Sequence, residues 1–289
     1  MSDTTRRHAL GSALGAAMGL MAAPLLGAAA PAPREIAYGG DPLQRLDLYP
    51  RAGLSGAPML LFVHGGGWNI GDKGMVSALP EYAERHGLLL ASTNYRLTPD
   101  VTARECAQDV AAAVAWMLAH GAGHGGDPRR LFIAGHSAGA HLVALVGVDP
   151  VYLGAHGRAP GDLAGVIPID GAGYDAVKQM AQPQRPGFIG RRLDEMYDLA
   201  FSADAAGLSP TLLVKPGRTY PPYLIFHVES RDDAREQSQG LANALRAAGG
   251  RAEVVAAPGE THRSINRGFG VAGDPEGERA AMFIKTGKL

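Results

Sequence analysis

The sequence predicts an α/β protein with a mostly parallel central sheet, helices on both faces and a small cap-like excursion at residues 171–220. The first observation is a series of short, continuous apolar runs along the chain. Strands that are covered on both faces have this appearance, because neither side meets solvent. The second observation is that helical patterns separate several of these runs. Such alternation of strands and helices is typical of a parallel sheet with helices packed on each side.

The predicted strands begin with a segment in which apolar and polar residues alternate. This pattern is typical of an edge strand that buries one face. The later segments are continuous apolar runs, as expected for strands inside the sheet. In chain order, the predicted strands are residues 44–50, 58–64, 87–95, 130–136, 164–170, 221–228 and 252–257.

Helical periodicity is found between several of these strands. In residues 106–118, Val110, Val114 and Met117 fall on one face of a helix. Residues 237–248 repeat the pattern, so both segments are predicted as amphipathic helices that pack on the sheet.

The excursion at residues 171–220 does not fit the alternation. It contains several prolines and one helical stretch, residues 191–203. Long connections between core elements usually serve as lids or pocket walls. We therefore expect this excursion to border the functional site.

The first residues of the chain, 1–32, are predicted to be an export signal. Arg6 and Arg7 precede a stretch without charged residues, Ala9 to Pro33, that is rich in alanine and glycine. This order resembles a twin-arginine signal, which exports folded proteins. The alternative is a membrane anchor, because the uncharged stretch is long enough to span a bilayer. We expect the signal to be removed, which leaves residues 33–289 as a single catalytic domain, periplasmic or secreted, without stable membrane insertion.

Charge and cysteine content exclude several classes of protein. The formal net charge of −1 and the lack of a basic run give no electrostatic basis for binding nucleic acid. Cys106 is the only cysteine, so neither an intramolecular disulfide nor a zinc site of the CxxC type is possible. The oligomeric state cannot be read from the sequence.

A serine motif follows the predicted strand 130–136. Residues 135–139 read GHSAG, and a helical run begins at Ala138. Gly-x-Ser-x-Gly at a turn from strand to helix is the nucleophile-elbow pattern, in which the glycines permit a strained turn that exposes the serine hydroxyl. The sequence therefore predicts Ser137 as a nucleophile.

Consecutive glycines follow the strand that ends near His64. Residues 64–67 read HGGG, and glycines let a backbone approach a ligand without a side chain in the way. Acyl transfer builds negative charge on the former carbonyl oxygen, and the loss of one hydrogen-bond donor to that oxygen costs about 2.7–4 kcal/mol. Together with the amide of Ala138, the glycine loop is predicted to form an oxyanion hole.

A nucleophilic serine needs a base and an acid that orients the base. His262 lies in a loop after the last predicted strand and is the best candidate for the base. The acid is expected just past the preceding strand, where Asp232 and Asp233 both remain candidates. Asp233 also matches a helix capping box with Glu236.

With these residues identified, the sequence resembles the α/β-hydrolase superfamily. Within it, the chain is similar to the branch of hormone-sensitive-lipase-like esterases, feruloyl-esterase-like hydrolases and kynurenine formamidases. The blocks that carry the likeness are HGGGW at 64–68, NYRL at 94–97, GHSAGAHL at 135–142 and PGETHRSIN at 258–266. The loop HVESRDD departs from the Gly-x-x-Asp pattern of many relatives. The resemblance implies Ser137 as nucleophile, His262 as base, Asp233 as acid, and Gly66, Gly67 and Ala138 as oxyanion donors.

The function expected from this set is that of a serine carboxylesterase acting on small or aryl carboxylic esters. The expected partner is a small-molecule ester, and neither a metal nor an organic cofactor is needed for acyl transfer through a serine. One alternative is an arylformamidase or amidase of the kynurenine formamidase type. Another is a non-catalytic hydrolase-like protein that only binds its ligand.

Overall fold

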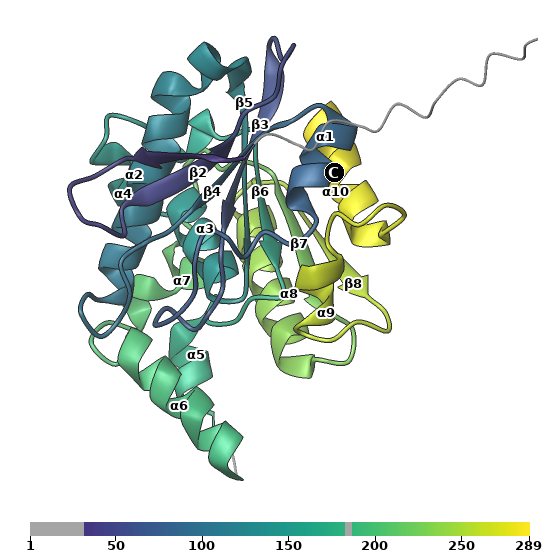
Figure 1. The fold of residues 1–289 in the computed structure, drawn as a ribbon. Coiled ribbons are helices and arrows are strands. Elements are labelled where there is room, and N and C mark those ends of the chain that lie inside the picture. Colours follow the sequence, from purple (N-terminus) through teal and green to yellow (C-terminus); the bar gives the residue numbers. More distant parts are fainter. Residues whose placement is uncertain (1–31, 183–186) are drawn as a thin grey trace, which may run out of the picture.

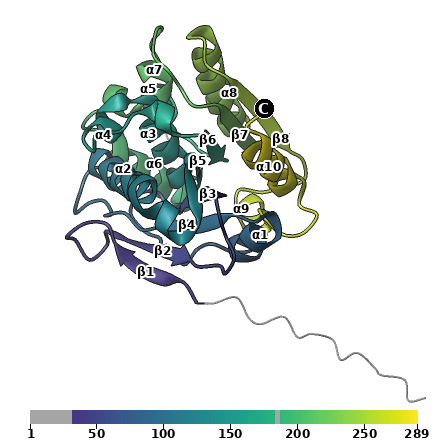
Figure 2. The same cartoon turned by 90° about the horizontal axis from the view of Figure 1, so that it is seen from above.

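The central sheet organises the computed structural model, which describes residues 32–182 and 187–289. Its strand order is β1-β2-β4-β3-β5-β6-β7-β8 (Figures 1 and 2). β1 pairs with β2, and β2 with β4, in antiparallel fashion, whereas all later pairs are parallel. The mostly parallel sheet is therefore confirmed. The strands are β1 (Arg34–Ala37), β2 (Arg45–Tyr49), β3 (Ala57–Val63), β4 (Leu89–Thr93), β5 (Gly126–His136), β6 (Gly165–Ile169), β7 (Tyr223–Val228) and β8 (Ala252–Ala257).

Helices cover both faces of this sheet and bury an apolar core on each side. Buried side chains of α2, α3 and α8 belong to one core, and those of α1, α9 and α10 belong to the other. The helices are α1 (Leu79–His86), α2 (Ala103–His120), α3 (Ala138–Val148), α4 (Pro150–Gly154), α5 (Ala176–Met180), α6 (Gly187–Phe201), α7 (Pro210–Leu213), α8 (Asp232–Ala247), α9 (Ser264–Gly268) and α10 (Pro275–Thr286), and short 3₁₀ turns lie at Gly121–His124, Pro160–Asp162 and Ala206–Leu208.

The antiparallel end of the sheet differs from the prediction. Residues 44–50, predicted as the edge strand, form β2, and β1 pairs along its outer side. Leu46, Asp47 and Leu48 are all buried, so both faces of β2 are covered rather than one. β1 is short and mostly exposed, and its sequence therefore lacks the apolar pattern that would reveal a strand.

The start of α2 shows how local sequence sets an element. Thr102 accepts a hydrogen bond from the backbone N–H of Glu105, and the carboxylate of Glu105 accepts one from the N–H of Thr102. This reciprocal pair satisfies two of the free donors at a helix start. One turn further, the Cys106 thiol is fully buried and donates to the carbonyl of Arg96 at 3.1 Å. Burial raises the pKa of this thiol to about 12.

The excursion at residues 171–220 forms a small cap, as predicted. It contains α5, α6 and α7, and α6 projects beyond the end of the sheet (Figure 1). The helix predicted at residues 191–203 is observed as α6. Its inner side buries Tyr197 and Phe201, and the Phe201 ring lies 4.9 Å from the Trp68 ring. The cap therefore rests on the loop that follows β3.

The predicted export signal, residues 1–32, falls almost entirely outside the described residues. Within residues 32–182 and 187–289, no helix has the length and apolar character needed to cross a membrane.

Candidate active site

Ser137 occupies the turn between β5 and α3, as the motif predicted. Its φ is 56°, a conformation that residues other than glycine rarely adopt and that costs about 1–3 kcal/mol. Its N–H donates to the carbonyl of Ile169 at 3.0 Å, which ties the turn to β6. A Cβ on Gly139 would overlap the carbonyl of Val63. The second glycine of the motif thus lets α3 start directly against the end of β3.

His262 lies between Ser137 and a carboxylate. Its Nε2 is 3.1 Å from Ser137 Oγ, and its Nδ1 is 2.6 Å from Oδ2 of Asp170. The histidine comes from the loop between β8 and α9, and the aspartate directly follows β6. Segments that follow the parallel strands β5, β6 and β8 thus bring hydroxyl, carboxylate and imidazole into contact. Asp170 has a φ of 45°. Ser137 and Asp170 therefore both adopt an uncommon backbone conformation at a strand end.

The carboxylate of Asp170 is fully buried and accepts three hydrogen bonds. Its Oδ1 accepts from the N–H of Val228 at 3.0 Å, and its Oδ2 accepts from Nη1 of Arg231 at 2.6 Å in addition to His262. Burial raises the pKa of Asp170, but the hydrogen bond from His262, the positive charge of Arg231 and the Val228 N–H outweigh it, and the pKa falls to about 2. Asp170 is therefore ionised at neutral pH.

The structure gives Asp170, and not Asp233, the contact expected of the orienting acid. Asp233 lies in the first turn of α8, where its Oδ2 accepts a hydrogen bond from Nη2 of Arg231 at 3.0 Å. Asp232, the other candidate, is 84% exposed and pairs with Arg235 on the surface. The expected capping box is not formed either, because α8 begins at Asp232 with Arg231 as its N-cap. Arg231 bonds both carboxylates, Asp170 through Nη1 and Asp233 through Nη2.

A signal for Asp170 was present in the sequence. Residues 164–170 form an apolar run that ends in an aspartate, and a charge at the end of a buried strand points out of the sheet edge where Ser137 lies. Asp170 also satisfies the chain order serine, acid, histidine. The prediction that the acid follows the next strand, at residues 221–228, was therefore wrong, because Asp170 at the end of the earlier strand makes the contact.

His136, the residue before the nucleophile, contacts the base from the side of β5. Its Nε2 donates to the backbone carbonyl of His262 at 2.8 Å, and the two rings lie 4.5 Å apart. Burial, followed by repulsion from His262, lowers the pKa of His136 to about 3. A neutral His136 therefore fixes the loop that carries the base without adding charge.

The glycine loop after β3 lies against the nucleophile. A Cβ on Gly65 would come within 3.0 Å of Ser137 Cβ. Gly66 has a φ of 116° and Gly67 a φ of 60°, and a Cβ on Gly66 would overlap the carbonyl of Ile70. Within the described part of the chain, neither Gly66 nor Gly67 donates its N–H to a backbone carbonyl. A loop with little room for side chains, and with two N–H groups that lack a backbone acceptor among the described residues, therefore borders the nucleophile.

A buried histidine joins the glycine loop, α3 and the cap. Trp68 Nε1 donates to Nδ1 of His141 at 3.3 Å, and Nε2 of His141 donates to the carbonyl of Leu208 at 2.7 Å. Burial lowers the pKa of His141 to about 4, so the ring is neutral and serves as acceptor on one side and donor on the other. The position of the loop is therefore coupled to that of the cap.

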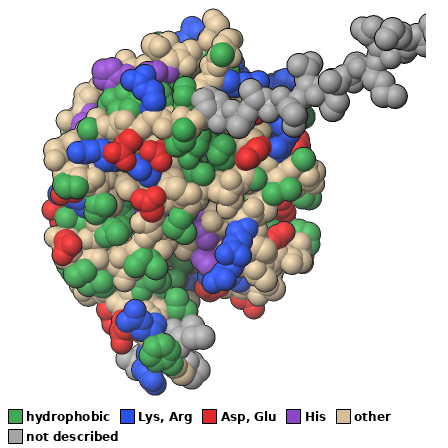
Figure 3. Space-filling view, in the orientation of Figure 1, with side chains coloured by type: hydrophobic (Ala, Val, Ile, Leu, Met, Phe, Trp, Pro, Cys, Tyr) green, Lys and Arg blue, Asp and Glu red, His purple; other side chains and the backbone are tan. Residues whose placement is uncertain are grey.

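A cavity of about 240 Å³ opens beside Ser137. Its polar lining residues are Ser137, Asp170, Arg231, Asp233 and His262, and its other, mostly apolar end is formed by the glycine loop and the cap. Histidine and basic side chains meet at the surface above the projecting cap (Figure 3). The residues that line the cavity are Gly67, Trp68, Ser137, Ala138, Asp170, Ala172, Leu193, Met196, Tyr197, Arg231, Asp233 and His262.

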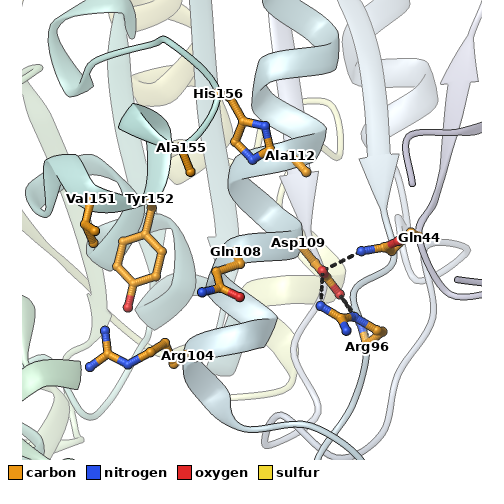
Figure 4. A pocket seen from close by; sticks show the side chains of 10 residues that line it. All are labelled: Gln44, Arg96, Arg104, Gln108, Asp109, Ala112, Val151, Tyr152, Ala155 and His156. Carbon is orange, nitrogen blue, oxygen red and sulfur yellow. Dashed lines mark hydrogen bonds and ion pairs between the residues drawn. The ribbon is translucent and has the colours of Figure 1, made fainter. Parts of the chain in front are cut away.

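A second hollow, of about 490 Å³, lies at α2 and α4 (Figure 4). The carboxylate of Asp109 in this hollow already has partners. Nε and Nη2 of Arg96 each donate to it at 2.8 Å, and Gln44 donates to it as well. None of the predicted site residues lines this hollow. Across the described residues there is also no group of three His, Cys, Asp or Glu side chains arranged to hold a metal ion.

Comparison with known proteins supports the same architecture. The chain is 28% identical over 245 residues to a probable isoprenylcysteine alpha-carbonyl methylesterase of Arabidopsis thaliana, an alignment that covers 80% of this chain and 51% of the relative. It is 32% identical over 231 residues to esterase LipC of Mycobacterium tuberculosis, which covers 74% of this chain and 55% of the relative. The chain thus spans about half the length of these curated relatives.

Solved structures share the fold at low sequence identity. Thermogutta terrifontis esterase 2, phosphonylated by sarin, superimposes with a TM-score of 0.73 at 23% identity, covering 90% of this chain and 97% of that one. Esterase B of Lactobacillus rhamnosus HN001 gives a TM-score of 0.69 at 24% identity, covering 88% and 83%. A family model described as the alpha/beta hydrolase fold matches residues 60–266. The chain therefore belongs to the α/β-hydrolase fold family, as the motifs around Ser137 and the glycine loop predicted.

Proposed function

We propose that this protein is a serine carboxylesterase that hydrolyses small or aryl carboxylic esters. The observation that carries the proposal is the line of contacts from Ser137 Oγ to His262 Nε2 at 3.1 Å and from His262 Nδ1 to Asp170 at 2.6 Å. Hydroxyl, imidazole and carboxylate in this order form the arrangement that activates a serine for acyl transfer. In this proposal Asp170 takes the role that the resemblance assigned to Asp233.

The first half of the reaction forms an acyl-enzyme. Ser137 Oγ attacks the ester carbonyl carbon while its proton moves to Nε2 of His262, and the carbonyl oxygen becomes an oxyanion. Asp170 accepts the hydrogen bond from Nδ1–H, which keeps Nε2 free as the base and stabilises the imidazolium that forms. When the bond to the alcohol oxygen breaks, the imidazolium gives its proton to that oxygen and the alcohol leaves.

The second half reverses these steps with water. His262 takes a proton from water as the water oxygen attacks the acyl carbon. The second tetrahedral species then breaks its bond to Ser137 Oγ and releases the acid, while the imidazolium returns the proton to Ser137 Oγ. The amides of Gly66, Gly67 and Ala138 are proposed to bind the oxyanion in both halves. Their support is that the glycine loop contacts Ser137 and that the two glycine N–H groups have no backbone acceptor among the described residues.

The cavity supports a small substrate. Its volume of about 240 Å³ is below the range of about 300–1,000 Å³ typical of sites for drug-sized ligands. The cap closes its apolar end, because a Cβ on Gly67 would overlap the sulfur of Met196. A short acyl chain or a single aromatic ring fits this space. Relatives of this chain are named as esterases, which agrees with ester hydrolysis.

The test compares the wild-type enzyme with Ser137→Ala. We expect the wild type to hydrolyse p-nitrophenyl acetate and butyrate faster than longer esters, to show a burst of nitrophenol, and to gain the mass of one phosphonyl group on treatment with a fluorophosphonate. Ser137→Ala should lose the burst and the adduct. Full turnover in that variant would exclude the proposal. Faster hydrolysis of N-formylkynurenine than of any ester in the panel would favour the formamidase alternative.

A further inference from the structure

Arg231 makes a contact that the proposed mechanism does not use. Its Nη1 lies 2.6 Å from Oδ2 of Asp170 and 2.8 Å from Nδ1 of His262. Since Nδ1 is also 2.6 Å from the same Oδ2, the three atoms form a triangle. One carboxylate oxygen therefore serves two nitrogens, one from the base and one from a guanidinium.

The proton positions in this triangle are constrained by chemistry. Guanidinium nitrogens only donate hydrogen bonds. If Nδ1 carries a proton, as a base acting through Nε2 requires, Nδ1 and Nη1 are both donors and repel each other. If Nδ1 instead accepts from Arg231, Nε2 carries the proton and cannot take one from Ser137. In either case the guanidinium opposes a positive charge on the imidazole of His262.

Arg231 is held in this position from the other side. Its Nη2 donates to Asp233 at 3.0 Å, and its side chain is only 24% exposed. Burial lowers the pKa of Arg231, but the charges of Asp170 and Asp233 outweigh it and raise the pKa. Asp233 thus fixes a permanent cation next to the base.

The other groups around His262 do not supply an equivalent positive charge. From β5, His136 is neutral at neutral pH, and from β6, Asp170 is negative. On the histidine's own loop, Glu260 accepts a hydrogen bond from Ser264. The cap contributes Tyr197 to the cavity wall. Among the described residues, Arg263 on the same loop is exposed, and Arg231 is the cation with a contact to the imidazole.

We infer that Arg231 is a positioning residue that shares the Asp170 carboxylate with His262 and keeps the base unprotonated at lower pH than Asp170 alone would allow. The inference rests on the proposed function for its catalytic meaning. Its physical content, the effect of Arg231 on the protonation of His262, does not depend on which substrate is hydrolysed. A like charge in contact with a titrating group disfavours the charged form of that group, which moves the midpoint of its titration by about one pH unit or more.

The experiment measures this protonation directly. Full-length wild-type protein and Arg231→Met are labelled with ¹³C-histidine, and the ring Cε1–H resonance of His262, assigned by its loss in His262→Gln, is followed by NMR from pH 4 to pH 9. We expect the midpoint of the His262 titration to move up by about one pH unit in Arg231→Met. An unchanged or lower midpoint would overturn the inference.

Matched variants separate charge from folding. Arg231→Gln removes the charge but keeps a donor, and it should raise the midpoint even if Arg231→Met folds poorly. Arg231→Lys keeps the charge and should stay within a few tenths of a pH unit of the wild type. Asp232→Asn, which changes an exposed carboxylate outside the site, should leave the midpoint unchanged. A residue that only supports the fold would lower the melting temperature in all three Arg231 variants and leave the midpoint in place.

The rate of Ser137 phosphonylation is measured across the same pH range. We expect its acidic limb to move up with the NMR midpoint in Arg231→Met. If no protein is phosphonylated at any pH while the midpoint still moves, the proposed function fails and the role of Arg231 stands. If phosphonylation is normal but neither the limb nor the midpoint moves, the role of Arg231 fails and the proposed function stands.

Discussion

The turns that follow β6 and β7 each carry an aspartate near the base, but they hold it in different ways. Asp170 directly follows its strand, is fully buried, and bonds His262 and the N–H of Val228. Asp233 lies in the first turn of α8, is 33% exposed, lines the cavity and bonds Arg231. One carboxylate orients the imidazole, whereas the other orients the guanidinium.

The comparison shows that burial and direct contact, rather than the strand that an acid follows, decide which carboxylate can orient the base. A buried carboxylate whose lone pairs are occupied by fixed donors cannot rotate away from the imidazole. A half-exposed carboxylate on a helix start has water as a competing partner. Asp170 has the first kind of environment, and Asp233 has the second.

The largest expected effect is a difference in kcat between variants of Asp170 and Asp233. Asp170→Asn should lower kcat on p-nitrophenyl acetate by about 10⁴-fold, because an amide cannot hold the productive tautomer of the imidazole. Asp233→Asn, measured at a pH well above the acidic limb, should lower it by less than about tenfold. Equal losses in the two variants, or a larger loss in Asp233→Asn, would reverse the roles given to the two residues. Asp232→Asn is the matched control and should match the wild type.

The next effect concerns folding stability and its dependence on pH. The pKa of Asp170 is about 2 in the folded protein, compared with the ordinary value of 3.8 expected for the unfolded chain. Ionised Asp170 therefore contributes stability above about pH 4, and this stability is lost as the pH falls toward 2. We expect Asp170→Asn to lower the free energy of unfolding by about 2 kcal/mol at pH 7.

Urea unfolding curves between pH 7 and pH 3 measure this difference, which should become smaller at the acidic end. The matched variant Asp233→Asn should cost less than about 1 kcal/mol, because its ion pair is partly solvated. A stability difference for Asp170→Asn that grows as the pH falls would have the wrong sign for an ionised, buried carboxylate.

The smallest expected effect concerns His136, which bonds the loop that carries the base. His136→Phe keeps a ring against His262 but removes the N–H that donates to its backbone carbonyl. We expect kcat to fall by about tenfold, with KM within a factor of about three, because the imidazole keeps its contact with Asp170 and loses only support for its loop. Steady-state kinetics on p-nitrophenyl acetate measure both values. A loss as large as that of Asp170→Asn would show that the loop, and not the acid, sets the orientation of the base.

Local motifs made Ser137 and the glycine loop predictable from sequence. The glycines at 135 and 139 and the glycine loop are short-range patterns whose physical demands, a strained turn and a bare backbone, can be read from adjacent residues. The position of His262 after the last strand follows from the order of elements along a parallel sheet. The fold was predictable for the same reason, except for β1, whose exposed residues show no apolar pattern.

The local pattern marks Asp170 as a possible acid but does not choose between Asp170 and Asp233, because the choice depends on a contact between distant segments. Asp170 contacts the imidazole directly, whereas Arg231 bonds both Asp170 and Asp233. In the sequence, Arg231 is one basic residue in a polar turn. The three-dimensional arrangement is needed to show that it binds both aspartates and leaves one of them beside His262.

The buried thiol at Cys106 has a practical consequence for studying the cap. Cys106 is the only cysteine, and its side chain on α2 is fully buried. Maleimide dyes and spin labels should therefore not react with the folded native chain. A cysteine placed at an exposed position on α6, such as Leu199, would then be the single attachment point, with no background mutation to introduce. Fluorescence or electron paramagnetic resonance could follow that helix during turnover in an otherwise unmodified protein.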